Sequence, residues 1–164
     1  AEGVLCWAVE VNFVLQLKPA WIGDAAALLD IQRRCFAALL EKYQDYDTNP
    51  AMEPLESIRR KISERDYYFI LEDGKILGFA GIRRWEKTGR VSPIGVLPEY
   101  QGRGVGHGAM RLLEERYPDI FCWELDTILQ EPGLCRFYES LGYRRTGGSY
   151  EIKPGMDIID FCKR

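Results

Sequence analysis

The chain has 164 residues, of which 46% are hydrophobic, 29% charged and 12% aromatic, and its formal net charge is −3. This length and composition predict a single domain, residues 1–164, whose core needs neither disulfides nor a structural metal, and they exclude a long disordered segment. The mild acidity argues against nucleic-acid binding, which is typical of basic surfaces.

Five cysteines are scattered along the chain without a CxxC pair, and there is a single histidine, His107. We therefore expect reduced thiols, no metal site and a cytoplasmic location. No apolar run approaches the ~20 residues of a membrane-spanning helix, so we expect no membrane partner. Residues 1–10 lack a basic start and contain Glu2 and Glu10, which does not fit a signal peptide. We expect these ten residues to be irregular or partly foreign to the natural protein.

Apolar patterning places the first elements along the chain. Alternating residues over Val11–Leu17 predict a first strand. Asp24 is a good N-cap for a first helix, and Pro54 is a favoured first residue for a second helix. Apolar runs at Tyr67–Leu71 and Ile76–Ile82 flank an Asp-Gly pair, which predicts a β-hairpin.

The next predicted strand contains two residues that weaken pairing. A turn at Lys87–Gly89 leads into this strand, Arg90–Val96. Pro93 cannot donate a ladder hydrogen bond and Gly95 weakens a strand, so we expect a bulge or a break in pairing here.

The remainder of the chain predicts a third helix, another strand at Phe121–Thr127, a fourth helix closed by Gly142 and a final hairpin around Pro154 and Gly155. The resulting order is β-α-α-β-β-β-α-β-α-β-β. It indicates an α/β (α+β) domain with a mixed, mostly antiparallel central sheet of about seven strands, flanked by about four helices.

A glycine-rich turn lies between the Arg90–Val96 strand and the third helix. Leu97–Gly106 reads LPEYQGRGVG. Glycines let backbone N–H groups converge on one point, and the helix that follows adds its unpaired amides and the positive end of its dipole. This combination predicts a pyrophosphate site.

A dinucleotide site is one interpretation of this turn. Gly104–Ala109 matches GxGxxA, and Glu124 or Asp126 lies about 20 residues downstream. In a dinucleotide fold, however, the strand runs directly into the first glycine, whereas Pro98–Arg103 intervenes here. The segment after Asp126 is also too short for further βαβ units of ~30 residues each. We keep this interpretation as the less favoured one.

The second interpretation rests on two motifs in order. Gln101–Gly106 matches the [RQ]-x-x-G-x-[GA] element of the GNAT N-acetyltransferase superfamily, and the preceding Val96–Tyr100 is also similar to that family. Arg136–Tyr143, RFYESLGY, resembles its penultimate helix. The resemblance covers nearly the whole chain from about Val11. It implies acetyl transfer from acetyl-CoA, as co-substrate, to a primary amine of a small molecule or protein, by direct attack in a ternary complex.

The resemblance also implies roles for particular residues. The sequence pattern alone favours a core tyrosine at Tyr138, but Tyr138 occupies the tyrosine position of the family, and the resemblance makes it the candidate general acid. The N–H near Val96 would donate to the thioester oxygen, beside splayed fourth and fifth strands that hold the pantetheine arm. Glu131 stands where the family often has an asparagine that holds this arm, and an ionised glutamate cannot donate. The diphosphate would lie on the amides of Gln101, Gly102, Arg103, Gly104, Val105 and Gly106.

The general base stays open at this stage. Many family members carry a carboxylate on the fourth strand, but Arg90–Val96 contains none. Glu99, Glu124, Asp126 and solvent are the alternatives.

The acceptor also stays open. The segment Glu41–Glu56 contains five acids and one base, which predicts attraction of a cationic amine or, equally, an ordinary solvated loop. The missing carboxylate of the fourth strand keeps a second function in view, a non-catalytic acyl-CoA-binding sensor or interaction module. The resemblance leaves a homodimer open.

Overall fold

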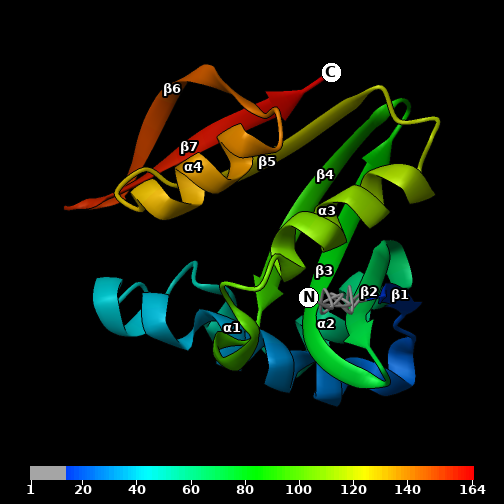
Figure 1. Ribbon diagram of the computed structural model, residues 1–164. Coiled ribbons are helices and arrows are strands. Elements are labelled where there is room, and N and C mark those ends of the chain that lie inside the picture. Colours follow the sequence, from blue (N-terminus) through cyan, green and yellow to red (C-terminus); the bar gives the residue numbers. More distant parts are fainter. Residues whose placement is uncertain (1–13) are drawn as a thin grey trace, which may run out of the picture.

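A computed structural model describes residues 14–164, which form a seven-stranded sheet with four α-helices (Figure 1). Their order is the one expected from the sequence. The strands are β1 (Leu15–Pro19), β2 (Asp66–Glu72), β3 (Lys75–Trp85), β4 (Thr88–Val96), β5 (Cys122–Ile128), β6 (Arg144–Lys153) and β7 (Met156–Lys163). The helices are α1 (Ala25–Tyr43), α2 (Leu55–Glu64), α3 (Val105–Arg116) and α4 (Pro132–Ser140).

The sheet contains one parallel junction. Its strand order is β1-β2-β3-β4-β5-β7-β6, and all neighbours are antiparallel except β4 and β5. These two strands pair only from Thr88 with Cys122 to Arg90 with Glu124. Beyond these three pairs their ribbons diverge (Figure 1). The predicted mostly antiparallel sheet is confirmed, and it differs from the mostly parallel sheet of the dinucleotide-binding fold.

The predicted break in β4 is confirmed. Ile94 pairs with Ala80, whereas Val91 pairs with Ile82, so Ser92 and Pro93 together stand opposite the single residue Gly81. One strand therefore carries an extra residue, which bends β4 and ends its regular pairing. This bulge lies just beyond the three residue pairs that join β4 to β5.

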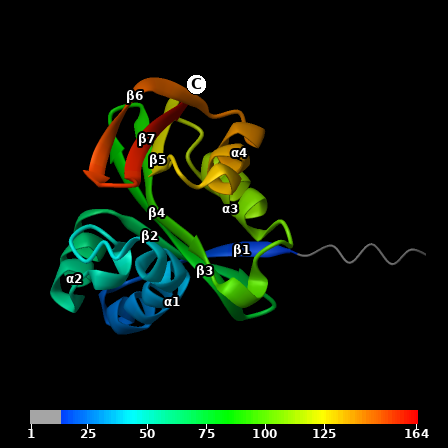
Figure 2. The ribbon, with the colours of Figure 1, turned by 90° about the vertical axis from the view of Figure 1, so that its left-hand side faces the viewer.

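Helices cover both faces of the sheet (Figure 2). On one face α1 and α2 bury a cluster with β2 and β3, and on the other face α3 and α4 bury a larger cluster with β2 to β5 and β7. Alternation along the strands explains this division, because Tyr67 and Phe69 face α1 while Tyr68 faces α3. Residues that share the α3–α4 cluster include Met110, Leu113, Leu125, Cys135, Tyr138 and Phe161.

Element ends differ from the sequence prediction in three places. β1 begins at Leu15 and continues to Pro19, and the predicted strand residues before Val14 lie outside the described part of the chain, as do residues 1–10. Asp24 directly precedes α1 as predicted, but α2 begins one residue after Pro54 rather than at it.

The turn predicted at Lys87–Gly89 is the third difference. β3 runs to Trp85, the turn is made by Glu86 and Lys87, and β4 begins at Thr88. Gly89 lies in β4 and not in the turn. Its lack of a side chain allows close packing, because a Cβ there would lie 2.7 Å from the Ile120 side chain.

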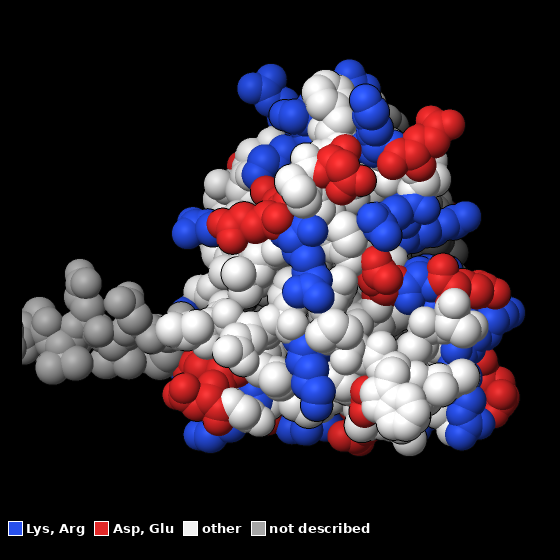
Figure 3. Space-filling model, turned by 90° about the vertical axis from the view of Figure 1, so that its right-hand side faces the viewer, with Lys and Arg blue, Asp and Glu red and all other residues white. Residues whose placement is uncertain are grey.

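Within residues 14–164 no helix is long and apolar enough to cross a membrane. On the face shown in Figure 3, side chains of both charge signs are interspersed, without a continuous basic patch.

Gly95 allows α1 to approach β4 closely. A Cβ at this position would lie 2.7 Å from the Cβ of Cys35 and 3.0 Å from the Phe79 ring. We predict that Gly95→Ala lowers the free energy of unfolding by about 1–3 kcal/mol, because the helix must shift. Denaturant unfolding measures this change. Gly133→Ala is the control, since nothing lies within 4 Å of a Cβ at that helical position. Equal stability of the two variants would contradict the close approach.

Candidate functional site

The opening between β4 and β5 exposes backbone groups of β4. The Leu97 amide donates to the Leu77 carbonyl at 2.8 Å, and Gly78 pairs with Val96. Hydrogen-bonded and non-hydrogen-bonded pairs alternate in an antiparallel ladder, so the N–H and C=O of Val96 point away from β3. They point toward the side where β5 has diverged. The Gln101 side chain donates to the Val96 carbonyl at 3.1 Å, which leaves the Val96 N–H directed into the opening.

The loop before α3 presents further backbone donors. Gly102 and Gly104 have φ of 75° and 80°, in the left-handed region that favours glycine, and nothing lies within 4 Å of a Cβ built on either. No hydrogen bond within residues 14–164 uses the amides of Gly102, Gly104, Val105 or Gly106. The first turn of α3 adds the positive end of its dipole. These neighbouring donors suit a phosphate or diphosphate group.

Gln101 and Arg103 differ from their neighbours in this loop. The Gln101 amide already donates to the Pro98 carbonyl at 3.3 Å, unlike the amides of its glycine neighbours. Gln101 contacts Val96 through its side chain. The Arg103 guanidinium donates to the Glu72 carboxylate of β2 at 3.1 Å, with its carbon 5.8 Å from the Tyr100 ring centroid. Both residues therefore anchor the loop to the sheet.

The C-terminal half of α4 packs against the start of α3. A Cβ at Gly106 would lie 3.0 Å from the Phe137 ring, and the His107 ring lies 4.7 Å from that ring. The His107 Nε2 and Ser140 Oγ atoms are 3.0 Å apart. The two sequence motifs singled out above therefore meet in space, and His107 has a packing role on the surface.

Tyr138 follows Phe137 and lies in the core between α4 and the sheet. It is 7% exposed, and its ring centroid lies 6.2 Å from that of Tyr143 and 6.0 Å from that of Phe161. Burial raises the pKa of Tyr138, and the negative charge of Asp126 raises it further. The hydroxyl therefore keeps its proton at neutral pH and can donate it. No hydrogen bond within the described residues uses this hydroxyl.

Three carboxylates surround one arginine on the sheet beside the opening. Arg90 of β4 lies 2.6 Å from Asp126, 3.3 Å from Asp160 and 3.6 Å from Glu124. Asp126 lies two residues beyond the last pair that joins β5 to β4, at the edge of the opening.

Glu99, the third acid considered as a general base, does not contact Arg90. It forms an exposed ion pair with Arg34 of α1 at 2.7 Å.

Glu131 links the end of α1 to the start of α4. Its carboxylate accepts from the Lys42 ammonium at 2.8 Å and from the Tyr43 hydroxyl at 2.9 Å. Burial and this hydrogen bond raise the pKa of Tyr43. Residues of α1 therefore bind the carboxylate that was expected beside a cofactor arm. This contact connects α1 with α4, which lie on either side of the opening.

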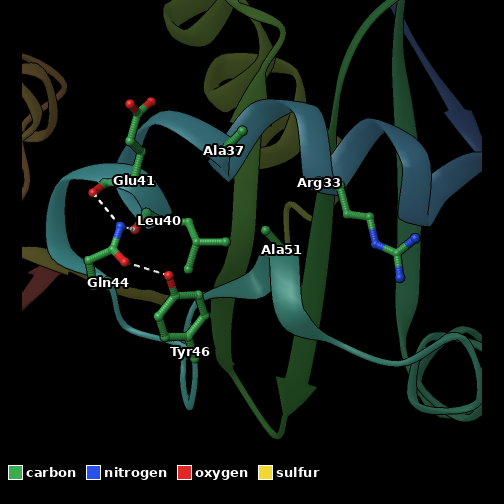
Figure 4. A pocket seen from close by; sticks show the side chains of 7 residues that line it. All are labelled: Arg33, Ala37, Leu40, Glu41, Gln44, Tyr46 and Ala51. Atoms are coloured by element: carbon green, nitrogen blue, oxygen red, sulfur yellow. Dashed lines mark hydrogen bonds between the residues drawn. The ribbon is translucent and has the colours of Figure 1, made fainter.

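The acidic segment Glu41–Glu56 is largely structural. Asp45 is buried, and its carboxylate accepts from the Asp47 and Thr48 amides and the Thr48 hydroxyl. Glu53 pairs with Lys61. Glu41 and Tyr46 instead border a groove of about 410 Å³ between α1 and the segment that follows it (Figure 4).

Several residues of the site were not recognised from the sequence. Arg90 holds three carboxylates together, and Lys42 and Tyr43 hold Glu131. Their partners are 34 to 89 positions away along the chain, and no local pattern records such pairs. The period-two alternation of β4 could have indicated only that Arg90 lies on the opposite face from Val91.

Comparison with known proteins relates this architecture to one family. The model of the acetyltransferase (GNAT) family matches residues 26–143. The uncharacterized protein YrkN of Bacillus subtilis is 38% identical over 96 residues, which are 57% of this chain and 45% of YrkN. The N-alpha-acetyltransferase RimI of Mycobacterium tuberculosis is 35% identical over 79 residues, 45% of this chain and 49% of RimI. In these alignments the chain spans about half the length of the curated relatives it matches.

Solved structures share the fold over most of the chain. The ribosomal-protein-S18-alanine N-acetyltransferase of Escherichia coli is similar at a TM-score of 0.72 and 16% identity, covering 91% of this chain and 92% of that one. YncA of Salmonella typhimurium, solved with its cofactor acetyl-CoA, gives a TM-score of 0.68 at 19% identity, covering 93% and 94%.

We predict that the Tyr43 hydroxyl helps to hold α1 against α4. Tyr43→Phe removes one hydrogen bond to Glu131 and should lower the free energy of unfolding by about 0.5–1 kcal/mol, because the bond is partly exposed. Thermal and denaturant unfolding measure the change. Tyr46→Phe is the control, since the exposed Tyr46 hydroxyl bonds only the nearby Gln44 among the described residues. Equal stability of the two variants would show that the Tyr43–Glu131 hydrogen bond does not stabilise the contact between α1 and α4.

Proposed function

The chain belongs to the GNAT acetyltransferase family, and on this premise we propose that it transfers the acetyl group of acetyl-CoA to an amine. The observation that carries the proposal is the set of unpartnered amides at the start of α3, next to the opening between β4 and β5. Acetyl-CoA supplies a thioester whose carbonyl carbon an amine attacks, with a thiolate as the leaving group.

Backbone groups of the α3 loop and of β4 fit two parts of acetyl-CoA, the charged diphosphate and the extended pantetheine arm. The amides of Gly102, Gly104, Val105 and Gly106 offer convergent donors to the diphosphate, at a helix N-terminus that favours negative charge. The outward N–H of Val96 offers a backbone partner to the pantetheine arm or to the thioester oxygen. A donor placed there stabilises the negative charge that develops on this oxygen during attack.

Tyr138 is proposed to hold the proton that the leaving thiolate needs. Its burial keeps the hydroxyl protonated, and the packing of Phe137 on Gly106 places its helix next to the loop that would hold the diphosphate. Proton donation in the transition state is general acid catalysis.

Asp126 is proposed to accept the proton that the amine loses, through water. It lies at the edge of the opening, two residues beyond Glu124, which belongs to the last pair between β4 and β5. Glu99 is bound to Arg34, away from this cluster. With three carboxylates against one guanidinium, this surface also favours a cationic acceptor, of a small molecule or a protein.

A thiol-release assay with acetyl-CoA and a panel of small amines and N-terminal peptides tests the proposal. Turnover with any amine above the rate of spontaneous hydrolysis supports it. Tight CoA binding without turnover would favour the alternative function, an acyl-CoA-binding sensor. The observation that supports this alternative is that β4 contains no carboxylate.

We predict that Tyr138→Phe lowers kcat by about 10²–10⁴-fold with little change in the KM for acetyl-CoA, because only the proton donor is removed. Steady-state kinetics measure both constants. Tyr143→Phe is the matched control, since its hydroxyl bonds Glu114 at 3.0 Å and its loss should affect stability rather than kcat. An equal loss of kcat in both variants would mean that Tyr138 has only a structural role in the core and is not the general acid.

We predict that Asp126→Asn lowers kcat by about 10²-fold or more and makes the rate rise steadily with pH, because hydroxide must replace the lost base. The pH profile of kcat is the measurement. Glu124→Gln changes a carboxylate on the same strand that also pairs with Arg90, and should leave the profile intact. A profile altered by Glu124→Gln and not by Asp126→Asn would exclude Asp126 as the base.

A further inference from the structure

Two cysteines that take no part in the proposed acyl transfer lie next to each other. The Sγ atoms of Cys122 and Cys162 are 3.1 Å apart, on the neighbouring strands β5 and β7. Both side chains are half-buried. They lie at the end of the sheet where β5 still pairs with β4, since Cys122 is the register partner of Thr88.

We propose that Cys122 and Cys162 form a modification site for low-molecular-weight disulfides, at which thiol–disulfide exchange joins the two residues. The thiolate of one cysteine attacks the reagent, forms a mixed disulfide and releases one thiol. The second cysteine, deprotonated by solvent, attacks the protein sulfur of the mixed disulfide and releases the second thiol. In total the protein loses two hydrogens and two electrons, and one reagent disulfide is reduced to two thiols.

A disulfide between the two cysteines requires a small backbone shift. Cys162 stands opposite Glu124, so Cys122 and Cys162 are diagonal neighbours on one face of the sheet. Diagonal neighbours are normally farther apart than directly opposite residues, and the sulfurs must approach by about 1 Å to reach bonding distance. Cys122 lies beyond Trp123 and Lys163, the last pair between β5 and β7. The bond therefore requires a shift only at the end of the ladder.

Charges of both signs lie around the pair, because Glu124 of β5 is the register partner of Cys162 and Arg164 follows β7. The pKa of Cys162 is raised overall, since burial and the Cys122 thiol raise it more than the Arg164 guanidinium lowers it. Arg144 of β6 is the other register neighbour of Cys162. Cationic side chains stabilise a thiolate and attract carboxylates such as those of glutathione disulfide. Mildly alkaline buffer should speed the reaction, because it increases the thiolate fraction.

Two other cysteines provide an internal comparison. Burial raises the pKa of Cys35 to about 12, and Cys135 is only 2% exposed, with its Sγ 3.8 Å from the Ile128 carbonyl. Neither lies next to a second thiol within the described residues. We expect both to react far more slowly than Cys122 and Cys162.

The experiment treats the full chain with glutathione disulfide in mildly alkaline buffer and follows intact mass, peptide maps and Tm. We expect a peptide that joins Cys122 to Cys162, a mass lower by two hydrogens and a rise in Tm of roughly 5–10 °C, because the bond closes a long loop. Dithiothreitol should reverse all three changes.

Single and double serine variants complete the test. Cys122→Ser and Cys162→Ser should each retain a glutathione adduct at the remaining cysteine, and the double variant should show the wild-type Tm when reduced and no shift with the reagent. The proposal is overturned if Cys122 or Cys162 of the wild type keeps a stable adduct or does not react, or if the cross-link forms through another cysteine. Because these readouts do not use catalysis, failure of the acyl-transfer proposal leaves this inference intact.

Discussion

Parallel strands that lie side by side usually continue to pair along their shared length, yet β4 and β5 part after Arg90 and Glu124. The backbone donor that β4 offers in the proposed site depends on this separation, which leaves the N–H of Val96 without a neighbouring strand. The loop that presents the amides of Gly104 to Gly106 follows Val96 closely in the sequence. A continuous β4–β5 ladder would use the same backbone groups internally and remove the site.

Packing at several places keeps the strands apart. The bulge at Ser92 and Pro93 bends β4 immediately beyond its last pair with β5. Arg90 binds carboxylates of β5 and β7, which fixes the closed end of the opening. On the other side, Glu131 ties α4 to the end of α1. The opening is thus bounded by interactions between residues far apart in the chain, and the Cys122–Cys162 pair lies at its closed end.

The sequence predicted the order of elements because each carries a local signal: the Asp-Gly hairpin, the helical spacing of α1 and α4, and the bulge-forming residues of β4. It also indicated the loop from Gln101 to Gly106, because glycine content and helix position are local properties. The turn after β3 was misplaced, since Gly89 is explained by a contact with Ile120 that no local pattern shows.

Site roles that depend on distant partners could not be predicted from the sequence. Asp45 belongs to the segment expected either to attract substrate or to be a solvated loop, but it is buried in its own turn. The contacts of Glu131 with Lys42 and Tyr43 were likewise not visible in the sequence, while its place beside the cofactor arm stays a prediction. The proposal of Asp126 over Glu124 rests on where the β4–β5 ladder ends, which the sequence does not show.

The most direct test of the central claim is a titration of the ¹⁵N-labelled protein with CoA, followed by amide chemical shifts. The account predicts that the largest changes occur at Gly102, Gly104, Val105 and Gly106, accompanied by a change at Val96. Binding of CoA with its largest changes elsewhere, or no change at these amides at saturating CoA, would contradict it.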